Sequence, residues 1–288
     1  MSTASTAAPT LTDHEVEQIE RANATGLTPV VFVHGLWLLP NSWDRWAELF
    51  EEAGYAAVAP GWPDDPRTVT EANEHPETFA NKSVGDIADH FDAAIRRLDR
   101  RPAIIGHSFG GLLTEILAGR GLAAVSVAMS PAPFRGVLPL PISALRSGGP
   151  VLKNPANRHR AVPLTFEQFV YGFANVVDAD EARDLYENYA VPGSGKPIWQ
   201  AANANFNPWT EAKVDTRNPD RGPMLIVSAD ADHTVPWAIA NASYKKQKRN
   251  EHAVTEIVKL EGRGHALTID HGWREVADTA LAFVSRFT

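Results

Sequence analysis

The stretch Gly106-His107-Ser108-Phe109-Gly110 places a serine between two glycines at the junction of two apolar runs. The run before it, Ala-Ile-Ile, is typical of a buried strand, and the run after it, Leu-Leu-Thr-Glu-Ile-Leu, is typical of a helix. A strand that reverses this sharply into a helix strains the backbone of the turn residue and projects its side chain from the sheet edge. Small neighbours two positions away on either side avoid a collision of Cβ atoms with the adjoining strand and helix. The sequence therefore predicts an exposed nucleophilic serine at a strand-to-helix turn.

Five further apolar segments predict buried strands. The run Pro-Val-Val-Phe-Val that begins at Pro29 is apolar and rich in β-branched residues, which is typical of a strand covered on both faces, as in a parallel sheet. These segments are residues 29–35, 55–60, 123–130, 224–229 and 254–261. Stretches with apolar residues at helical spacing lie between several of them and after the last one. The alternation predicts an α/β fold with a mostly parallel central sheet flanked by helices.

The alternation stops between about residues 131 and 221, a stretch rich in proline and aromatic residues. It contains helical patches such as TFEQFVYGFANVV and ADEARDLYENYA, and no convincing buried strand. We predict that 131–221 is a mainly helical cap insertion over the carboxyl edge of the sheet, where open α/β sheets bind ligands. The core then comprises residues 27–130 and 222–288. Residues 1–26 are expected to form a flexible leader and a short helix.

Composition narrows the class of protein further. Lys and Arg number 27 against 35 Asp and Glu, a net charge of −8, which argues against a nucleic-acid partner. The chain has no cysteine, so disulfides, thiolate metal ligands and cysteine nucleophiles are excluded. No segment is typical of a secretion signal or is long and apolar enough to span a membrane. We therefore expect no membrane partner and a cytoplasmic location. Thr12 and Glu15 have capping-box spacing at the start of the expected short helix.

A serine hydroxyl is a weak nucleophile at neutral pH. It needs a histidine as general base and a carboxylate that orients this histidine. On an α/β sheet both are expected after Ser108 in the chain, each on a loop that follows a buried strand. Asp230 and Asp232 follow one predicted strand, and His265 follows the next. This order predicts His265 as the base and leaves the two aspartates as candidates for the acid.

Other histidines have more ordinary interpretations. His233 is the main rival for the base because it is adjacent to the candidate acids. His34 and His107 neighbour glycines and are expected to pack or to form hydrogen bonds. We expect the remaining ones at the surface or in a terminal turn: His14, His75, His90, His159, His252 and His271.

Together these motifs resemble the α/β-hydrolase superfamily, in its serine-nucleophile, esterase- and lipase-like branch with a helical cap. The resemblance spans nearly the whole chain, from VFVHGLW through GHSFGG and SADADHTVP to GRGHAL. The acid motif of that family ends Asp-x-x-Val-Pro, which favours Asp232 over Asp230, and its base motif Gly-x-x-His ends at His265. One departure is Ser228-Ala229 before the acid loop, where the family usually has a glycine.

The resemblance also implies an oxyanion hole and a reaction class. The backbone N–H groups of Leu36 and Phe109 are the implied donors. Related haloalkane dehalogenases and epoxide hydrolases use an aspartate as nucleophile, so Ser108 favours acyl transfer instead. No metal and no organic cofactor is expected.

The implied activity is hydrolysis of a carboxylic ester or lactone of a small, largely apolar substrate through an acyl-enzyme. Trp37 and Phe134 neighbour the expected site and are the predicted substrate-binding residues. Other reactions on the same triad stay open: C–C bond hydrolysis, cofactor-free perhydrolase or haloperoxidase chemistry, and hydroxynitrile cleavage. A slow-turnover ligand-binding receptor of the same fold is the alternative from another class.

Overall fold

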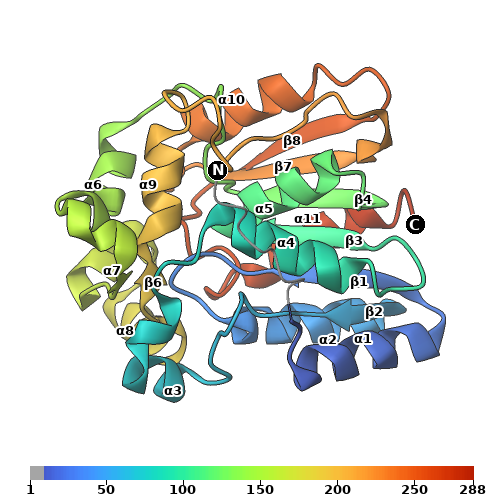
Figure 1. Cartoon of the computed structure of the whole chain (residues 1–288), viewed down its shortest axis with the longest axis horizontal. Helices are drawn as coiled ribbons and strands as arrows, with labels where there is room; N and C mark the ends of the chain where they lie inside the picture. The colour runs from blue at the N-terminus through green and yellow to red at the C-terminus, as the bar shows by residue number, and fades with distance from the viewer. Residues whose placement is uncertain (1–9) are drawn as a thin grey trace, which may run out of the picture.

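The computed structural model describes residues 10–288 and has a central sheet between two layers of helices (Figure 1). The sheet has six strands in the order β2-β1-β3-β4-β7-β8, and all of their pairings are parallel. The α/β fold and its parallel sheet are thus confirmed. The predicted flexible leader falls largely on residues 1–9, outside the described residues. The strands are β1 (Thr28–Val33), β2 (Tyr55–Val58), β3 (Ala103–His107), β4 (Val125–Met129), β7 (Met224–Ala229) and β8 (Thr255–Leu260).

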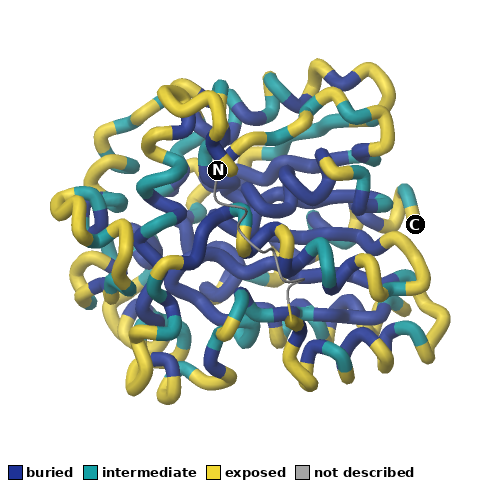
Figure 2. Tube along the Cα trace, viewed as in Figure 1, coloured by how far each residue is buried: buried dark blue, intermediate teal, exposed yellow. Residues whose placement is uncertain are grey.

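Alternate strand residues face opposite layers of helices, as the period of two requires. Phe32 and Ile105 belong to the cluster on one face, whereas Val31 and Ile104 belong to the cluster on the other. The tube in Figure 2 is buried along most of the sheet, which agrees with the continuous apolar runs in the sequence. The expectation of a buried strand at 254–261 is wrong, because β8 is an edge strand in which only Leu260 is buried. Helices α2 (Asp44–Glu52) and α11 (Trp273–Val284) contribute to the first cluster. The second contains residues of α1 (Asp13–Thr25), α4 (Val84–Ile95), α5 (Phe109–Gly119) and α10 (Trp237–Gln247).

The N-terminal helix begins where its capping signal predicts. The Thr12 hydroxyl accepts a hydrogen bond from the Glu15 N–H group, and the Glu15 carboxylate accepts one from the Thr12 N–H group. Glu15 also contacts His90 on α4, with 2.8 Å between Oε1 and Nε2. Both side chains are buried, so the expectation of a surface position for His90 is wrong. The partner lies 75 positions earlier in the chain, beyond the reach of local periodicity.

Between β4 and β7 the chain forms the group of elements on the left of Figure 1, which is called the cap from here on. It comprises α6 (Ile142–Leu152), η3 (Pro155–His159), α7 (Phe166–Gly172), α8 (Ala179–Tyr189) and α9 (Gly195–Asn203). It also contains a two-stranded antiparallel sheet, β5 (Ala161–Val162) with β6 (Gly193–Ser194). The expectation of no buried strand here is wrong, because β6 is buried. Two-residue strands carry no periodicity, and Gly-Ser has no strand preference.

Short elements complete the described chain: η1 (Pro40–Trp43), α3 (Val69–Glu74), η2 (Pro76–Phe79) and η4 (Pro219–Arg221). None of the helices within residues 10–288 combines the length and the apolar character that crossing a bilayer requires.

Candidate active site

Ser108 lies at the turn between β3 and α5, with a backbone φ of 58° and ψ of −119°. This is a strained conformation for a residue with a side chain. The two flanking glycines make it possible. A Cβ atom on Gly106 would lie 2.2 Å from the Gly110 carbonyl oxygen, and one on Gly110 would lie 2.0 Å from the Val33 carbonyl oxygen. The turn therefore packs so closely against α5 and β1 that neither Gly106 nor Gly110 could be replaced by a residue with a side chain.

Three side chains from separate loops form one hydrogen-bonded line. His265 Nε2 lies 2.9 Å from Ser108 Oγ, and His265 Nδ1 lies 2.7 Å from Asp232 Oδ2. Ser108 follows β3, Asp232 follows β7 and His265 follows β8, so the carboxyl ends of three parallel strands bring them together. All three are almost fully buried. Asp230, by contrast, is exposed.

The Asp232 carboxylate is held by its own loop. Its Oδ1 atom accepts hydrogen bonds from the N–H groups of Thr234 at 2.7 Å and Val235 at 2.8 Å. Burial by itself would raise the pKa of Asp232, but the His265 charge and hydrogen bond and the Val235 N–H group outweigh it and lower that pKa. Asp232 is therefore an anion that can hold the His265 ring with Nδ1 protonated.

Neighbouring histidines do not compete for the serine. The His107 ring lies against His265, with 4.6 Å between ring centroids. Burial and the nearby His265 charge keep the pKa of His107 well below its ordinary value, so it is neutral. His233 stacks on Tyr171, and its Nδ1 atom lies 3.0 Å from the Tyr171 carbonyl oxygen.

The turn after β1 lies against the serine. A Cβ atom on Gly35 would be 3.0 Å from Ser108 Cβ, so only glycine allows this approach. Leu36 follows Gly35 and Phe109 follows Ser108, so both implied oxyanion donors belong to residues directly next to this contact. Phe109 is the first residue of α5, where N–H groups lack helical partners and favour negative charge.

A buried ion pair supports this turn. His34 Nε2 lies 3.1 Å from Asp65 Oδ2, and Lys82 Nζ lies 2.7 Å from Asp65 Oδ1. His34 also stacks on Trp62, which agrees with its expected structural role. Burial would raise the pKa of Asp65, yet the contact with His34 and the Lys82 charge together lower it. His34 therefore contacts an ionised Asp65 carboxylate, which Lys82 contacts from its other oxygen.

Aromatic side chains of the cap cover the site. Phe173 contacts His265 edge-on at 4.9 Å between centroids, stacks on Phe169 at 5.1 Å and meets Trp37 edge-on at 6.2 Å. Ser108 is only 4% exposed, so the prediction of an exposed hydroxyl is wrong for this conformation. The space beside Trp37 and Gly35 measures about 10 Å³, near the minimum for one water.

The two predicted substrate-binding residues differ in position. Trp37 lines that narrow space, and its Nε1–H group donates to the Val162 carbonyl oxygen of β5 at 2.8 Å. Its φ is 66°, a strained value that the cap contact holds in place. Phe134 is buried in the main core cluster. Substrate contact by either residue stays a prediction.

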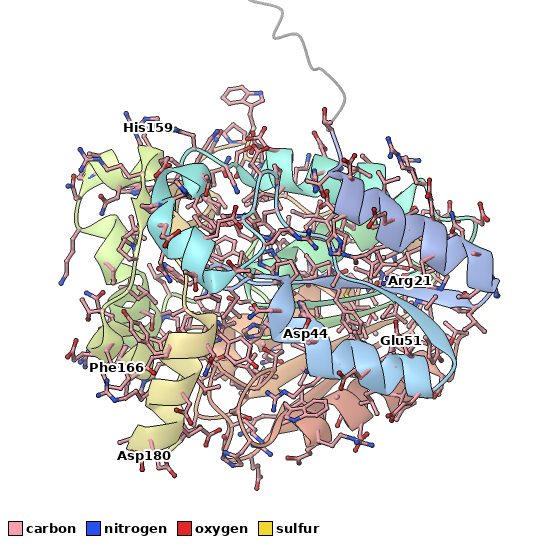
Figure 3. The ribbon with its side chains drawn as sticks, turned by 90° about the horizontal axis from the view of Figure 1, so that it is seen from below. Arg21, Asp44, Glu51, His159, Phe166 and Asp180 are labelled. Carbon is pink, nitrogen blue, oxygen red and sulfur yellow. The ribbon has the colours of Figure 1, made fainter. Side chains whose placement is uncertain are left out.

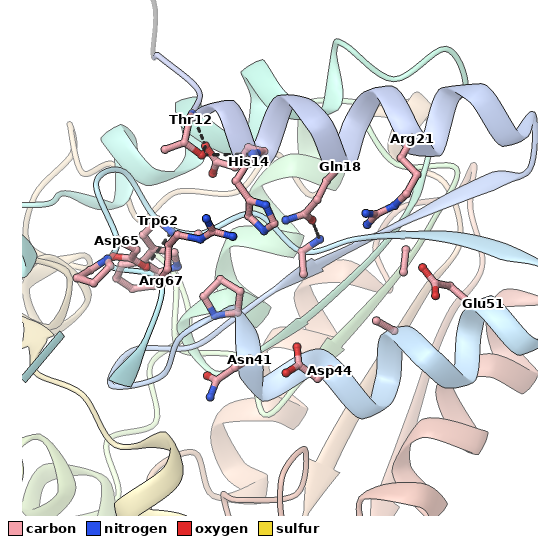
Figure 4. A pocket seen from close by; sticks show the side chains of 17 residues that line it. Thr12, His14, Gln18, Arg21, Asn41, Asp44, Glu51, Trp62, Asp65 and Arg67 are labelled. Carbon is pink, nitrogen blue, oxygen red and sulfur yellow. Dashed lines mark hydrogen bonds between the residues drawn. The ribbon is translucent and has the colours of Figure 1, made fainter. Parts of the chain in front are cut away.

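A larger cavity of about 430 Å³ lies elsewhere, between α1 and α2 (Figure 3). Arg21 of α1 and Glu51 of α2 line it from facing walls (Figure 4). Trp62 and Asp65 are common to this cavity and to the narrow space beside Trp37. Ser108, Asp232 and His265 do not line this cavity.

Two cap residues at the site escaped the sequence reasoning. Phe173 covers His265, and its carbonyl oxygen accepts the Ala266 N–H group at 3.0 Å. Asn175 Nδ2 donates to the Ala231 carbonyl oxygen at 2.9 Å, beside the acid. The aromatic-rich sequence around Phe173 indicates that aromatic residues lie near the site. Its helical spacing does not indicate which of them faces the sheet. Within the described residues no cluster of three or more His, Asp or Glu could bind a metal ion.

Comparisons with known proteins agree with this architecture. The sequence model described as the alpha/beta hydrolase family matches residues 30–279. A search of curated proteins finds no match. The solved structures that match include a monoacylglycerol lipase from Paleococcus ferrophilus, with a TM-score of 0.62 and 21% identity, over 90% of this chain and 95% of that one.

Two further structures show the same fold. One is described with two metagenome-derived lipolytic enzymes, LipS and LipT, with a TM-score of 0.60 and 22% identity, over 90% of this chain and 94% of that one. The other is a pyrethroid hydrolase from Sphingobium faniae, with a TM-score of 0.60 and 17% identity, over 90% and 97%. The family match covers most of the chain, and the sheet order and the serine turn agree with it: this chain belongs to the alpha/beta hydrolase family.

Proposed function

We propose that this chain is a serine esterase that cleaves a carboxylic ester or lactone of a small, largely apolar substrate. The observation that carries the proposal is the continuous line from Ser108 Oγ through the His265 ring to Asp232. A strained turn and a buried carboxylate fix its two ends, as nucleophilic catalysis requires.

In the proposed reaction Ser108 Oγ attacks the ester carbonyl carbon while His265 Nε2 takes the hydroxyl proton. Asp232 stabilises the resulting imidazolium and keeps its orientation. The N–H groups of Leu36 and Phe109 bind the developing oxyanion, each contributing about 3 kcal/mol to the lowering of the barrier. His265 then protonates the leaving alcohol.

The second half of the reaction releases the acid. His265 takes a proton from a water molecule, which attacks the acyl carbon, and the proton then returns to Ser108 as the ester bond to the enzyme breaks. The aromatic surroundings of the site, Trp37, Phe169 and Phe173, support an apolar substrate. The matched structures include lipolytic enzymes and a pyrethroid hydrolase, which supports the hydrolysis of an ester.

The test is steady-state hydrolysis of a short p-nitrophenyl ester by the full-length protein. Ser108→Ala should lower turnover by roughly 10⁴- to 10⁶-fold while the circular dichroism spectrum stays unchanged. Retained turnover in the folded variant would exclude the proposed mechanism. A single burst without further turnover would favour the slow receptor instead, and a panel with lactones and vinylogous diketones separates the other reactions.

A further inference from the structure

The cap carries most of the exposed large apolar side chains of the described chain. Of eight such residues, six lie on two neighbouring cap segments. We call them the cap-edge patch: Leu138, Leu140, Ile142, Leu145, Phe206 and Trp209. The exposed fraction is 85% for Ile142, Phe206 and Trp209. Side chains this exposed protrude from the surface and do not line a groove.

The two segments lie side by side. Asn205 Nδ2 donates to the Val137 carbonyl oxygen at 2.9 Å, and the Gly136 N–H group donates to Asn205 Oδ1 at 2.7 Å. Arg135 adds a bond from its guanidinium to the Pro208 carbonyl oxygen at 3.1 Å. The residues that follow each anchor, 138–145 and 206–209, therefore begin next to each other, and α6 packs against α9. Exposed apolar surface of this extent marks a contact with another phase or molecule.

The segment that carries most of the patch has a charge opposite to that of the whole chain. Between residues 131 and 166 the sequence has no Asp or Glu, although the chain as a whole carries −8. The same segment has five cationic residues, all exposed: Arg135, Arg146, Lys153, Arg158 and Arg160. Figure 3 shows the neighbouring His159 on the cap, far from the cavity marked by Arg21 and Glu51.

The nearest carboxylate on the second segment, that of Glu211, is held against the start of α4. Glu211 Oε2 accepts hydrogen bonds from the Gly85 N–H group at 2.8 Å and from Gln200 Nε2 at 2.6 Å. Helix α6 connects the apolar and basic parts, from Ile142 at its start to Lys153 just after its end. At 1.5 Å per residue this is about 16 Å, so both parts fit beneath one flat surface.

We propose that the cap-edge patch docks this protein on the surface of an anionic phospholipid bilayer. Protruding aliphatic and aromatic side chains enter the boundary between headgroups and acyl chains, and the surrounding cations contact the anionic headgroups. Phe and Trp are suited to this boundary because they are large and apolar, with a polar handle in Trp. The sequence expectation of no membrane partner rested on the lack of a spanning segment, which a surface contact does not need. The inference goes beyond the proposed esterase activity and does not depend on it.

The experiment is flotation of the full-length protein with two kinds of vesicle, pure phosphatidylcholine and phosphatidylcholine with phosphatidylglycerol. We expect binding to the mixed vesicles, weaker binding to the pure ones, and loss of binding in high salt. The variant Leu138→Ser/Leu140→Ser/Ile142→Ser should lower partitioning at least about tenfold. In Arg146→Gln/Lys153→Gln each lost cation should weaken it roughly fivefold.

A matched control places the same polar change elsewhere. Leu27 and Val254 are 41% and 45% exposed and lie just before β1 and β8, at the opposite ends of the strands from the cap. Leu27→Ser/Val254→Ser should leave vesicle binding unchanged. Hydrolysis of a soluble ester should be the same in all variants, because none of these residues lies in the candidate site.

Three results would overturn the proposal. One is no binding to vesicles of either composition. Another is binding that the triple serine variant retains. The third is a dimeric unmodified protein and a monomeric triple serine variant in light scattering, with equal vesicle binding by both. The patch would then join two copies of the chain.

Discussion

At the scale of single residues, the site depends on a backbone that is strained where the chemistry is proposed. The positive φ of Ser108 costs on the order of 1–3 kcal/mol, and the close packing of Gly106 and Gly110 maintains it. Asp232 shows the same principle for a charge: a buried carboxylate stays ionised because three hydrogen bonds, from His265, Thr234 and Val235, satisfy it. The proposed roles of Ser108 and Asp232 therefore depend on the surroundings of these two positions, and another serine or aspartate of the chain does not share them.

The first prediction concerns the choice between two adjacent aspartates. Asp232→Asn should lower kcat/KM for a p-nitrophenyl ester by roughly 10³- to 10⁴-fold, because an amide stabilises neither the required tautomer nor the imidazolium. Asp230→Asn is the matched control, since Asp230 is exposed two positions away. Its kcat/KM should stay within about twofold. Equal losses in both variants would contradict the assignment of Asp232.

At the scale of elements, two buried polar networks hold the site between its helices and loops. One connects Lys82 and Asp65 with His34 after β1. The other connects Glu115 on α5 with Ser243 and Gln247 on α10. Each spans a long stretch of sequence, so it aligns elements that local propensity cannot align.

Loss of one partner of the Lys82–Asp65 pair is expected to be severe. Lys82→Met leaves the Asp65 carboxylate buried with one partner fewer, and we expect a loss of about 3–5 kcal/mol in the free energy of unfolding. Lys196→Met removes a half-exposed lysine 3.8 Å from Asp86 and should cost less than about 1 kcal/mol. Urea unfolding of both variants measures the difference. Similar small losses would show that the buried pair does not stabilise the turn.

Glu115 predicts a pH dependence of stability. Burial raises its pKa from 4.5 to about 7, against the hydrogen bonds from Ser243 and Gln247 and the attraction of Arg221. The folded state therefore holds a proton that the unfolded state releases, so stability is lost as pH rises from 4.5 through 7. Glu115→Gln removes this loss. The free energy of unfolding of Glu115→Gln minus that of the unmodified protein should therefore be larger at pH 8 than at pH 5, by about 2–3 kcal/mol.

Urea unfolding at the two pH values tests this directly. The exposed substitution Glu187→Gln serves as control and should show no such change. A difference between Glu115→Gln and the unmodified protein that is the same at both pH values would mean that Glu115 is ionised throughout.

At the scale of the whole molecule, the sheet and the meeting of the three side chains could be predicted, whereas the closure of the site could not. Buried strands are recognisable from their apolar runs, and a parallel sheet brings their carboxyl ends to one edge, which is why Ser108 and His265 meet. Local residues did not decide between Asp230 and Asp232. The family motif did, and the structure places Asp232 against His265.

Long-range contacts account for what the sequence did not reveal. The cover of Phe173 over His265 and the contact of His90 with Glu15 depend on how the cap and α1 pack, which no local pattern contains. Lys82 and Asp65 likewise have no periodic relation to the turn after β1. The cap-edge patch could be predicted in part. The absence of Asp and Glu from residues 131–166 is visible in the sequence, whereas the exposure of the apolar residues follows from the fold.

Covalent labelling by a serine-directed p-nitrophenyl phosphonate tests most directly whether Ser108 is the nucleophile. Peptide mass spectrometry locates the labelled residue. We expect one adduct, on Ser108, that is absent in Ser108→Ala and forms far more slowly in Asp232→Asn. An adduct on a different residue, or equal labelling of Ser108→Ala, would contradict the claim that Ser108, His265 and Asp232 act as one nucleophilic unit.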